Sequence, residues 1–244
     1  QHAAVPRQRP SPVPDDALAR ARAAGAPPLP AETSARDSSW RDGLDEILAH
    51  VDTCLLPDAA RAVVTVLGRR DADALERLAT ACLRAQVPAA EVGTALFVVA
   101  ALQVWFAAAA AALPAAALAL LPRRGRCPVC GSAPVAGMIG ASGPAGGARY
   151  LHCGLCATAW NHVRAVCIQC GEAKDLVLEA IGGGSGLVKG ETCGACRGYL
   201  KMLYQVEDMQ AEPAADDLAS LGLDLLLAEA GWARHAPNPL IIAG

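Results

Sequence analysis

Between residues 40 and 113, apolar positions recur at the spacing of amphipathic helices. The first set is three or four residues apart and shares one face: Trp40, Leu44, Ile47, Leu48 and Val51. The same periodicity predicts two further helices, over residues 60–67 and 71–86, and Pro57 and Pro88 mark the breaks between segments. The pattern therefore predicts a helical domain, which we place at residues 37–124.

Residues 94–113 carry no charged side chain, so by length alone this segment could span a bilayer. The arginines that follow it, Arg123, Arg124 and Arg126, would fit the cytoplasmic flank of a spanning helix. Much of the segment is alanine, however, and Gln103 lies near its centre. We therefore expect the central helix of a bundle, packed against the three preceding helices. The side chains expected to pack are Leu96, Phe97, Val104, Trp105 and Phe106.

The segments on either side of this domain differ in pattern. Residues 1–36 are rich in Pro, Ala and Arg with almost no large apolar side chains, which predicts a disordered or extended segment. Residues 208–244 are predicted to form a helix, Asp216 to Ala230, and an extended tail. Between them, short apolar runs separated by Gly and Cys predict strands over residues 135–139, 148–152, 158–166, 176–181 and 199–206. The predicted fold class is therefore α+β.

Eight cysteines organise the strand region into two equivalent units. They form four Cys-x-x-Cys pairs, the last two repeating the first two at an offset of 40 residues: Cys127/Cys130, Cys153/Cys156, Cys167/Cys170 and Cys193/Cys196. Gly131 and Gly154 recur as Gly171 and Gly194 in the same register. A fixed period is typical of a duplicated structural unit. We therefore predict two zinc-ribbon-like modules, residues 125–165 and 166–207.

The spacing predicts two metal sites of four sulfurs each. A Cys-x-x-Cys turn directs both sulfurs at one point, and two such turns complete a tetrahedral thiolate site that suits zinc or iron. Four cysteines leave no coordination position for a substrate, which argues against a hydrolytic site. The repeat groups the first four cysteines around one metal and the last four around the other. Joining the two inner turns instead, four disulfides, and thioredoxin-like pairs are the alternatives.

Composition narrows the classes of function. The chain of 244 residues has a formal net charge of −3 and a sequence pI near 6.0, so its charge does not indicate a nucleic-acid partner. The sequence contains no recognisable nucleophile–base pair or phosphate-binding glycine loop, which argues against an enzyme. Cys54 and Cys82 have no partner spacing and are expected to be core thiols. Many unpaired thiols are typical of the reducing cytoplasm.

Five stretches of the chain together resemble one known family. They are CPVCGSAPVAG, RYLHCGLCATAW, VRAVCIQCG, VKGETCGACRGYLKMLYQ and ADDLASLGLDLLLAEAGW, and a PNPL motif follows them. These stretches are similar to FdhE-type formate dehydrogenase accessory proteins. The similarity is continuous from about Cys127 to Leu240 and weaker over the helical region. By this comparison the chain is expected to be shortened at its start.

The resemblance implies a fold, a metal and a partner. Such proteins have an N-terminal helical domain followed by two rubredoxin-like modules, and iron is the metal associated with their cysteines. Zinc stays compatible with the spacing. They are cytoplasmic, non-catalytic factors that act on the molybdenum-containing catalytic subunit of formate dehydrogenase before its export. The resemblance thus implies this subunit as the partner, with neither nucleic acid nor stable membrane insertion.

Four residues near the second cysteine pair are candidate contacts to the partner: His152, Trp160, His162 and Arg164. Family members commonly carry Trp-His-x-x-Arg here, whereas this chain has Asn161 at the His position and His162 one residue later. In a strand, such a displacement moves a side chain to the opposite face, so a contact through this imidazole would differ. For Trp160 we expect packing between the modules rather than partner binding.

The residues alone are also compatible with two other classes of function. A tandem zinc-ribbon protein that binds nucleic acid would carry clusters of Lys and Arg around its cysteine turns, whereas here these residues are scattered. A rubredoxin-like electron carrier or thiol redox protein would use the same cysteines for redox chemistry. The resemblance favours the assembly factor.

Overall fold

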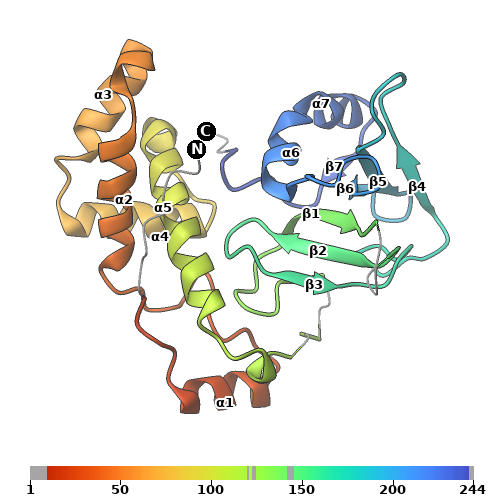
Figure 1. Ribbon diagram of the computed structural model, residues 1–244, viewed down its shortest axis with the longest axis horizontal. Helices are drawn as coiled ribbons and strands as arrows, with labels where there is room; N and C mark the ends of the chain where they lie inside the picture. The colour runs from red at the N-terminus through yellow and green to blue at the C-terminus, as the bar shows by residue number, and fades with distance from the viewer. Residues whose placement is uncertain (1–9, 120, 123–124, 142–145, 242–244) are drawn as a thin grey trace.

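A computed structural model describes residues 10–119, 121–122, 125–141 and 146–241. In this part of the chain, helices α1–α5 form one half, and a sheet covered by α6 and α7 forms the other (Figure 1). The α-helices are α1 Asp15–Ala24, α2 Ser39–His50, α3 Asp58–Leu67, α4 Ala72–Leu83, α5 Val92–Ala111, α6 Pro213–Ala219 and α7 Leu221–Glu229. Short 3-10 turns are η1 Thr53–Leu55, η2 Ala89–Glu91 and η3 Ala115–Ala117. The predicted α+β class is confirmed.

Helices α2 to α5 lie where the apolar periodicity predicts helices. Helix α5 is strongly apolar, and α2, α3 and α4 pack against it and bury Val98, Leu102 and Phe106. Leu96, which we expected to pack in the bundle, is instead exposed, because it lies on a side of α5 that the other helices leave open. Among the described residues, one segment, Ala89–Ala111, is long and apolar enough to cross a membrane, and half of its most apolar stretch is buried.

The N-terminal segment differs from the expected disorder, apart from residues 1–9, which lie outside the described part. It forms helix α1 (Figure 1) and then runs along the first cysteine turn. There the amides of Leu29 and Ala31 donate to the carbonyl oxygens of Val129 and Cys130, each at 2.9 Å. Both donors' side chains are buried. The order of this segment comes from partners far along the chain, which its own composition does not reveal.

Asp37 joins this segment to the helices. Its carboxylate accepts hydrogen bonds from the amide of Ser39 at 3.1 Å and the indole of Trp105 at 3.0 Å, and also from the amide of Ser11. Burial raises the pKa of Asp37, but the hydrogen bonds from Ser39, Ser11 and Trp105 outweigh it and hold the pKa well below its usual range. The ionised carboxylate therefore contributes to the free energy of unfolding.

Asp37→Asn is expected to lower the free energy of unfolding by about 1–3 kcal/mol, because hydrogen bonds to the charged acceptor are weakened. Since the folded-state pKa is depressed, this contribution is fully present above the unfolded pKa of about 3.9 and is lost as the pH falls through the folded pKa. Urea unfolding between about pH 8 and pH 5 should therefore show a constant difference. The exposed Asp45→Asn variant of α2 is the control. A difference that already shrinks above about pH 6 would contradict the assignment.

The strands of the two cysteine modules belong to one continuous sheet. The strands are β1 Pro134–Ile139, β2 Arg149–Cys153, β3 Ala159–Asn161, β4 Leu176–Glu179, β5 Val188–Cys193, β6 Gly198–Tyr204 and β7 Ala233–Arg234. Their order is β3-β2-β1-β6-β5-β4, and β7 pairs with β6. Within each module the strands are antiparallel, whereas β1 and β6 join the modules in parallel through Gly137 opposite Met202.

Strand β5 is absent from the expected set of strands, and β3 is shorter than expected. The 40-residue repeat contains the signal for β5, because residues 149–153 of β2 correspond to residues 189–193. The sequence of β5, VKGETC, shows no apolar alternation, so periodicity alone does not predict this strand, which β4 and β6 pair with on either side. Strand β3 ends at Asn161 because the chain then turns toward the third cysteine pair.

The single C-terminal helix that we expected is two helices, α6 and α7, which meet at Ser220. The cause is Lys201 of β6, whose side chain is fully buried. Its ammonium group donates to the carbonyl oxygens of Asp217 at 2.7 Å and Ser220 at 3.3 Å, and to the Ser220 hydroxyl at 3.0 Å. Carbonyl groups at a helix end need such donors. The break therefore places α6 and α7 around one buried cation.

Candidate metal centres

Each cysteine pair lies in a tight turn whose conformation recurs along the chain. The residue after the second cysteine always has a positive φ: Gly131 (77°), Ala157 (56°), Gly171 (79°) and Arg197 (58°). In the first and third turns, the glycine amide donates to the carbonyl oxygen of the first cysteine, at 2.9 and 3.0 Å. Glycine adopts this conformation without steric cost. The 40-residue period is thus a repeat of backbone geometry.

The first site brings together the four cysteines that the repeat predicts. The sulfurs of Cys127, Cys130, Cys153 and Cys156 all lie within 4.8 Å of one another. The shortest separations are 3.5 Å, between Cys127 and Cys156, and 3.4 Å, between Cys130 and Cys153. Metal–sulfur bonds of about 2.3 Å in a tetrahedron require sulfurs about 3.8 Å apart, whereas a disulfide requires about 2 Å. The spacing fits a tetrahedral metal site.

The first site is enclosed by both halves of the molecule. All four cysteines are buried and belong to the same core as Trp40 and Trp105 of the helical half. Gln103, at the centre of α5, donates from its side-chain amide to the carbonyl oxygen of Gly154 at 2.6 Å. The amides of Leu155 and Cys156 each donate to the Cys153 sulfur at 3.4 Å. A metal held here would link the helices to the sheet.

Four buried thiols this close together cannot all ionise on their own. Hydrogen bonds with Cys127, Cys130 and Cys153 lower the pKa of Cys156, whereas hydrogen bonds with their neighbours raise the pKa of Cys130 and Cys153. Negative charge is therefore shared unequally among the sulfurs. A cation among them would hold all four as thiolates, since metal binding displaces thiol protons. This donor set suits zinc or iron.

The second site has the same composition but is more open. The sulfurs of Cys167, Cys170, Cys193 and Cys196 again lie within 4.8 Å of one another, with separations of 3.7 Å between Cys167 and Cys196 and 3.6 Å between Cys170 and Cys193. Cys170 is exposed and Cys196 is half-buried. Burial raises the pKa of Cys196 to about 12, whereas a backbone hydrogen bond at Glu172 lowers the pKa of Cys170. The two sites are thus alike in geometry and different in access.

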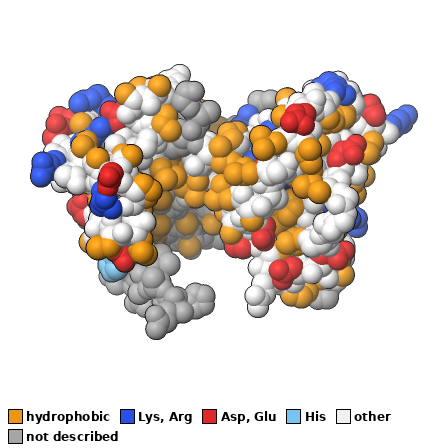
Figure 2. All heavy atoms as spheres, turned by 90° about the horizontal axis from the view of Figure 1, so that it is seen from above, with side chains coloured by type: hydrophobic (Ala, Val, Ile, Leu, Met, Phe, Trp, Pro, Cys, Tyr) orange, Lys and Arg blue, Asp and Glu red, His pale blue; other side chains and the backbone are white. Residues whose placement is uncertain are grey.

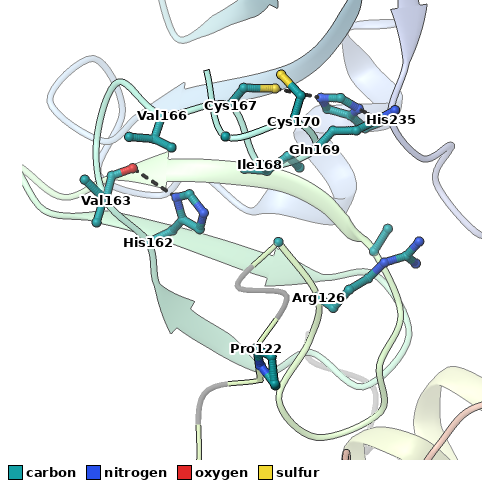
Figure 3. Close-up of a pocket in the computed structure, with 13 residues that line it drawn as sticks. Pro122, Arg126, His162, Val163, Val166, Cys167, Ile168, Gln169, Cys170 and His235 are labelled. Atoms are coloured by element: carbon teal, nitrogen blue, oxygen red, sulfur yellow. Dashed lines mark hydrogen bonds between the residues drawn. The ribbon is translucent and has the colours of Figure 1, made fainter. Parts of the chain in front are cut away.

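A cavity of about 620 Å³ opens beside the second site (Figure 3). Its wall contains Cys167 and Cys170 from the third cysteine turn and His162 from the segment that joins the modules. His235, which directly follows β7, lies on the same wall with Nε2 3.9 Å from the Cys167 sulfur. Of the described residues that line this cavity, none is acidic, and Arg126 carries the positive charge.

The four candidate partner contacts differ in exposure. Trp160 of β3 is 4% exposed and His162 is 7% exposed, and both lie within the fold rather than on its surface. His152 is half-buried, and burial lowers its pKa. Arg164 is exposed and donates to the carbonyl oxygen of Gly147 at 3.0 Å. The burial of Trp160 fits a packing role, and Arg164 is the candidate most accessible to a partner.

Asn161 and His162 lie on different sides of the fold, one exposed and the other buried. Asn161 is exposed, and its side-chain amide donates to the carbonyl oxygen of Arg149 at 3.1 Å. His162 lies one residue beyond the end of β3, and its Nδ1 is 2.9 Å from the carbonyl oxygen of Val163. Because the strand has ended, His162 points into the cavity beside the second site (Figure 3).

Two other cysteines and one histidine lie in surroundings that their sequence context does not reveal. Cys54, expected to be a core thiol, is exposed because it lies in the 3-10 turn between α2 and α3. Cys82 is partly buried, and burial raises its pKa to about 11. The position of His235 beside the second site was not predicted, because His235 lies far from every cysteine pair in the sequence. Only the pairing of β7 with β6 brings it to the second site.

A second cavity, apolar and about 330 Å³ in volume, lies between the two halves. Leu83, Val99 and Leu102 of the helical half form one wall, and Leu155 and Pro239 belong to the opposite wall. Figure 2 shows apolar side chains gathered in the hollow between the halves. The halves therefore meet through an apolar surface that is not completely filled.

Comparison with known proteins shows one family along the chain. Three family models match it: "FdhE, N-terminal" over residues 1–122, "FdhE, central domain" over residues 126–164, and "FdhE, C-terminal domain" over residues 165–241. The chain is 39% identical to an FdhE homolog of Cronobacter sakazakii, over 94% of this chain and 75% of the relative. It is 42% identical to one of Edwardsiella ictaluri, over 93% and 73%. The crystal structure of the FdhE protein from Pseudomonas aeruginosa matches with a TM-score of 0.83 and 34% identity, covering 97% of this chain and 82% of that one.

Proposed function

This chain belongs to the FdhE family, and on that premise we propose that it is a cytoplasmic accessory protein required to assemble active formate dehydrogenase. In this proposal it binds the catalytic subunit of that enzyme and performs no reaction itself. The observation that carries the proposal is the family match over the helical half and both cysteine modules.

The geometry of the two sites supports a binding role rather than catalysis. Each site offers four sulfurs, which complete a tetrahedron and leave no position for a substrate or an activated water. The eight proposed ligands are Cys127, Cys130, Cys153, Cys156, Cys167, Cys170, Cys193 and Cys196. Iron is the metal that we favour by family resemblance, and zinc fits the same donor set. When bound, the metals would fix the cysteine turns and hold the sheet half in shape.

The shape of the molecule fits the same role. The first site lies where the helical half meets the sheet half, and Gln103 and the segment after α1 bond directly to its turns. A metal there would fix the relative position of the two halves, so that a partner meets one rigid surface. Arg164, exposed beside the junction of the modules, is our leading candidate for a contact within that surface.

The test is complementation in a bacterium whose own gene of this family has been deleted. Expression of the chain should restore formate-dependent dye reduction, and the affinity-tagged chain should retain the catalytic subunit in a pull-down. Arg164→Ala is expected to weaken retention several-fold, as loss of one charged interface contact typically does, with the exposed Arg69→Ala variant as control. The proposal fails if the folded, metal-containing chain neither restores activity nor retains the subunit.

A further inference from the structure

The two four-cysteine sites differ in how far the protein shields them. We infer that the second site is an exchangeable metal site, entered through the adjoining cavity and partly closed by His235, whereas the first site holds its metal permanently. The inference concerns the chain's own residues and does not depend on which partner the protein binds.

The first difference between the two sites is the solvent exposure of their cysteines. The sulfur-bearing residues of the first site are each at most 4% exposed, and the site lies in a core shared with the helical half. At the second site, Cys170 is exposed and Cys196 half-buried, and neither belongs to an apolar core cluster. A chelator or competing thiolate must reach a metal–sulfur bond in order to replace it. Only the second site offers such an approach in the described structure.

The cavity supplies the route. Its volume of about 620 Å³ exceeds that of a small chelating molecule, and both Cys167 and Cys170 form part of its wall (Figure 3). The described residues that line it include no carboxylate that would repel an anionic chelator. Arg126 and the two imidazoles of His162 and His235 instead give this wall a polar character that suits an anionic or sulfur-bearing ligand.

His235 lies where it can control exchange. Its Nε2 is 3.9 Å from the Cys167 sulfur, and its Nδ1 contacts the side-chain oxygen position of Gln169. The Nδ1–H donates to this oxygen, which fixes the ring with its Nε2 edge against the sulfur. An imidazole fixed in this way covers the Cys167 sulfur, and neighbouring groups of this kind hold a metal-bound ligand in place. His235 is thus a positioning residue for the second site.

Gly198 makes room for this imidazole. A Cβ atom at residue 198 would lie 2.5 Å from Cε1 of His235, so any larger residue there would force the imidazole to move. Gly198 begins β6, two residues after Cys196, and its backbone pairs with Ala233 of β7. The glycine and the β6–β7 pairing together place the ring against the cysteine turn. The first site has no corresponding group among the described residues, because residue 158, the position equivalent to Gly198, is Thr158, whose hydroxyl lies 3.1 Å from the Cys156 sulfur.

The test measures zinc release from the zinc-loaded full chain after addition of a chromogenic chelator. We expect one zinc to leave at least about 10-fold faster than the other, as the chelator takes the cation and solvent protonates the sulfurs. Alkylation with N-ethylmaleimide during the fast phase, followed by peptide mapping, should label Cys170 and Cys196 before any cysteine of the first site. Cys54, exposed and outside both sites, should be labelled at once and serves as the internal standard.

His235→Ala should accelerate the fast phase about 10-fold and leave the slow phase unchanged. His235→Gln, which keeps a polar side chain that can cover the sulfur, should restore part of the original rate. The exposed His50→Ala variant of α2 is the matched control and should change neither phase. Release of both ions at one rate, or early labelling of the first site, would overturn the exchange inference. An unchanged fast phase in His235→Ala would overturn the role of His235.

Discussion

Cys130→Ser is expected to destabilise the protein much more than Cys170→Ser, although the two cysteines occupy equivalent positions of the 40-residue repeat. Each substitution removes one of four sulfurs from a site. Cys130 is 2% exposed, and its site shares a core with Trp40 and Trp105, whereas Cys170 is exposed. Loss of the first metal should therefore loosen the contact between helices and sheet as well as one module.

The expected loss for Cys130→Ser is about 5 kcal/mol or more, a large part of the roughly 10 kcal/mol that a structural zinc contributes. Cys170→Ser should cost roughly 2 kcal/mol, because its site can open locally while the rest stays folded. Urea unfolding of the zinc-loaded variants, followed by far-ultraviolet circular dichroism, measures both, since that signal reports the helices. Equal losses would contradict the first site's link to the helical half.

Lys201→Met is the second substitution with a large expected effect. The ammonium group is fully buried, 3.1 Å from a carboxylate oxygen of Asp217 and 2.5 Å from one of Asp224. The Asp217 side chain is also fully buried, and it pairs with Arg234 and accepts a hydrogen bond from Asn238 at 3.1 Å. Arg234 alone cannot balance both Asp217 and Asp224, so removing the Lys201 cation leaves one buried negative charge uncompensated, which costs about 3–5 kcal/mol.

Lys189→Met is the matched control, because Lys189 lies opposite Met202 on the neighbouring strand β5. Lys189 is only half-buried, and its ammonium group lies 4.5 Å from the ring centre of Tyr204, a contact worth about 0.5–1 kcal/mol. Thermal and urea unfolding of both variants provide the comparison. The double variant Lys201→Met/Asp217→Asn should be more stable than the sum of the two single losses predicts, since it removes both charges. A Lys201→Met protein as stable as the control would show that the network contributes little.

The features that the sequence predicted well are those that neighbouring residues determine. Helices α2 to α5 follow from apolar spacing within each segment, and the grouping of the eight cysteines follows from the repeat. The cysteine turns need only a few consecutive residues, because a positive φ after the second cysteine completes each one. Domain boundaries, metal identity and partner contacts stay predictions.

The features that the sequence did not predict depend on distant partners. The amides of Leu29 and Ala31 donate to carbonyl oxygens beside the first site, so a Pro-rich segment that was predicted to be disordered becomes ordered. Lys201 interrupts a helix that its own periodicity would continue. His235 reaches the second site only because β7 pairs with β6. None of these contacts leaves a periodic signal, since one side chain or one backbone pairing determines each.

The parallel pairing of β1 with β6 also affects the order in which the protein can form during its synthesis. The three strands of the first module are made early, but β1 is an inner strand of the finished sheet, and its partner β6 is the last strand of the second module. At ribosomal speeds of about 5–20 residues per second, the edge of β1 is unpaired in the nascent chain for on the order of seconds. An unpaired edge invites pairing with other chains. Early metal binding at the first site would hold β1 and β2 together through that interval, so the supply of metal during translation would govern the yield of folded protein.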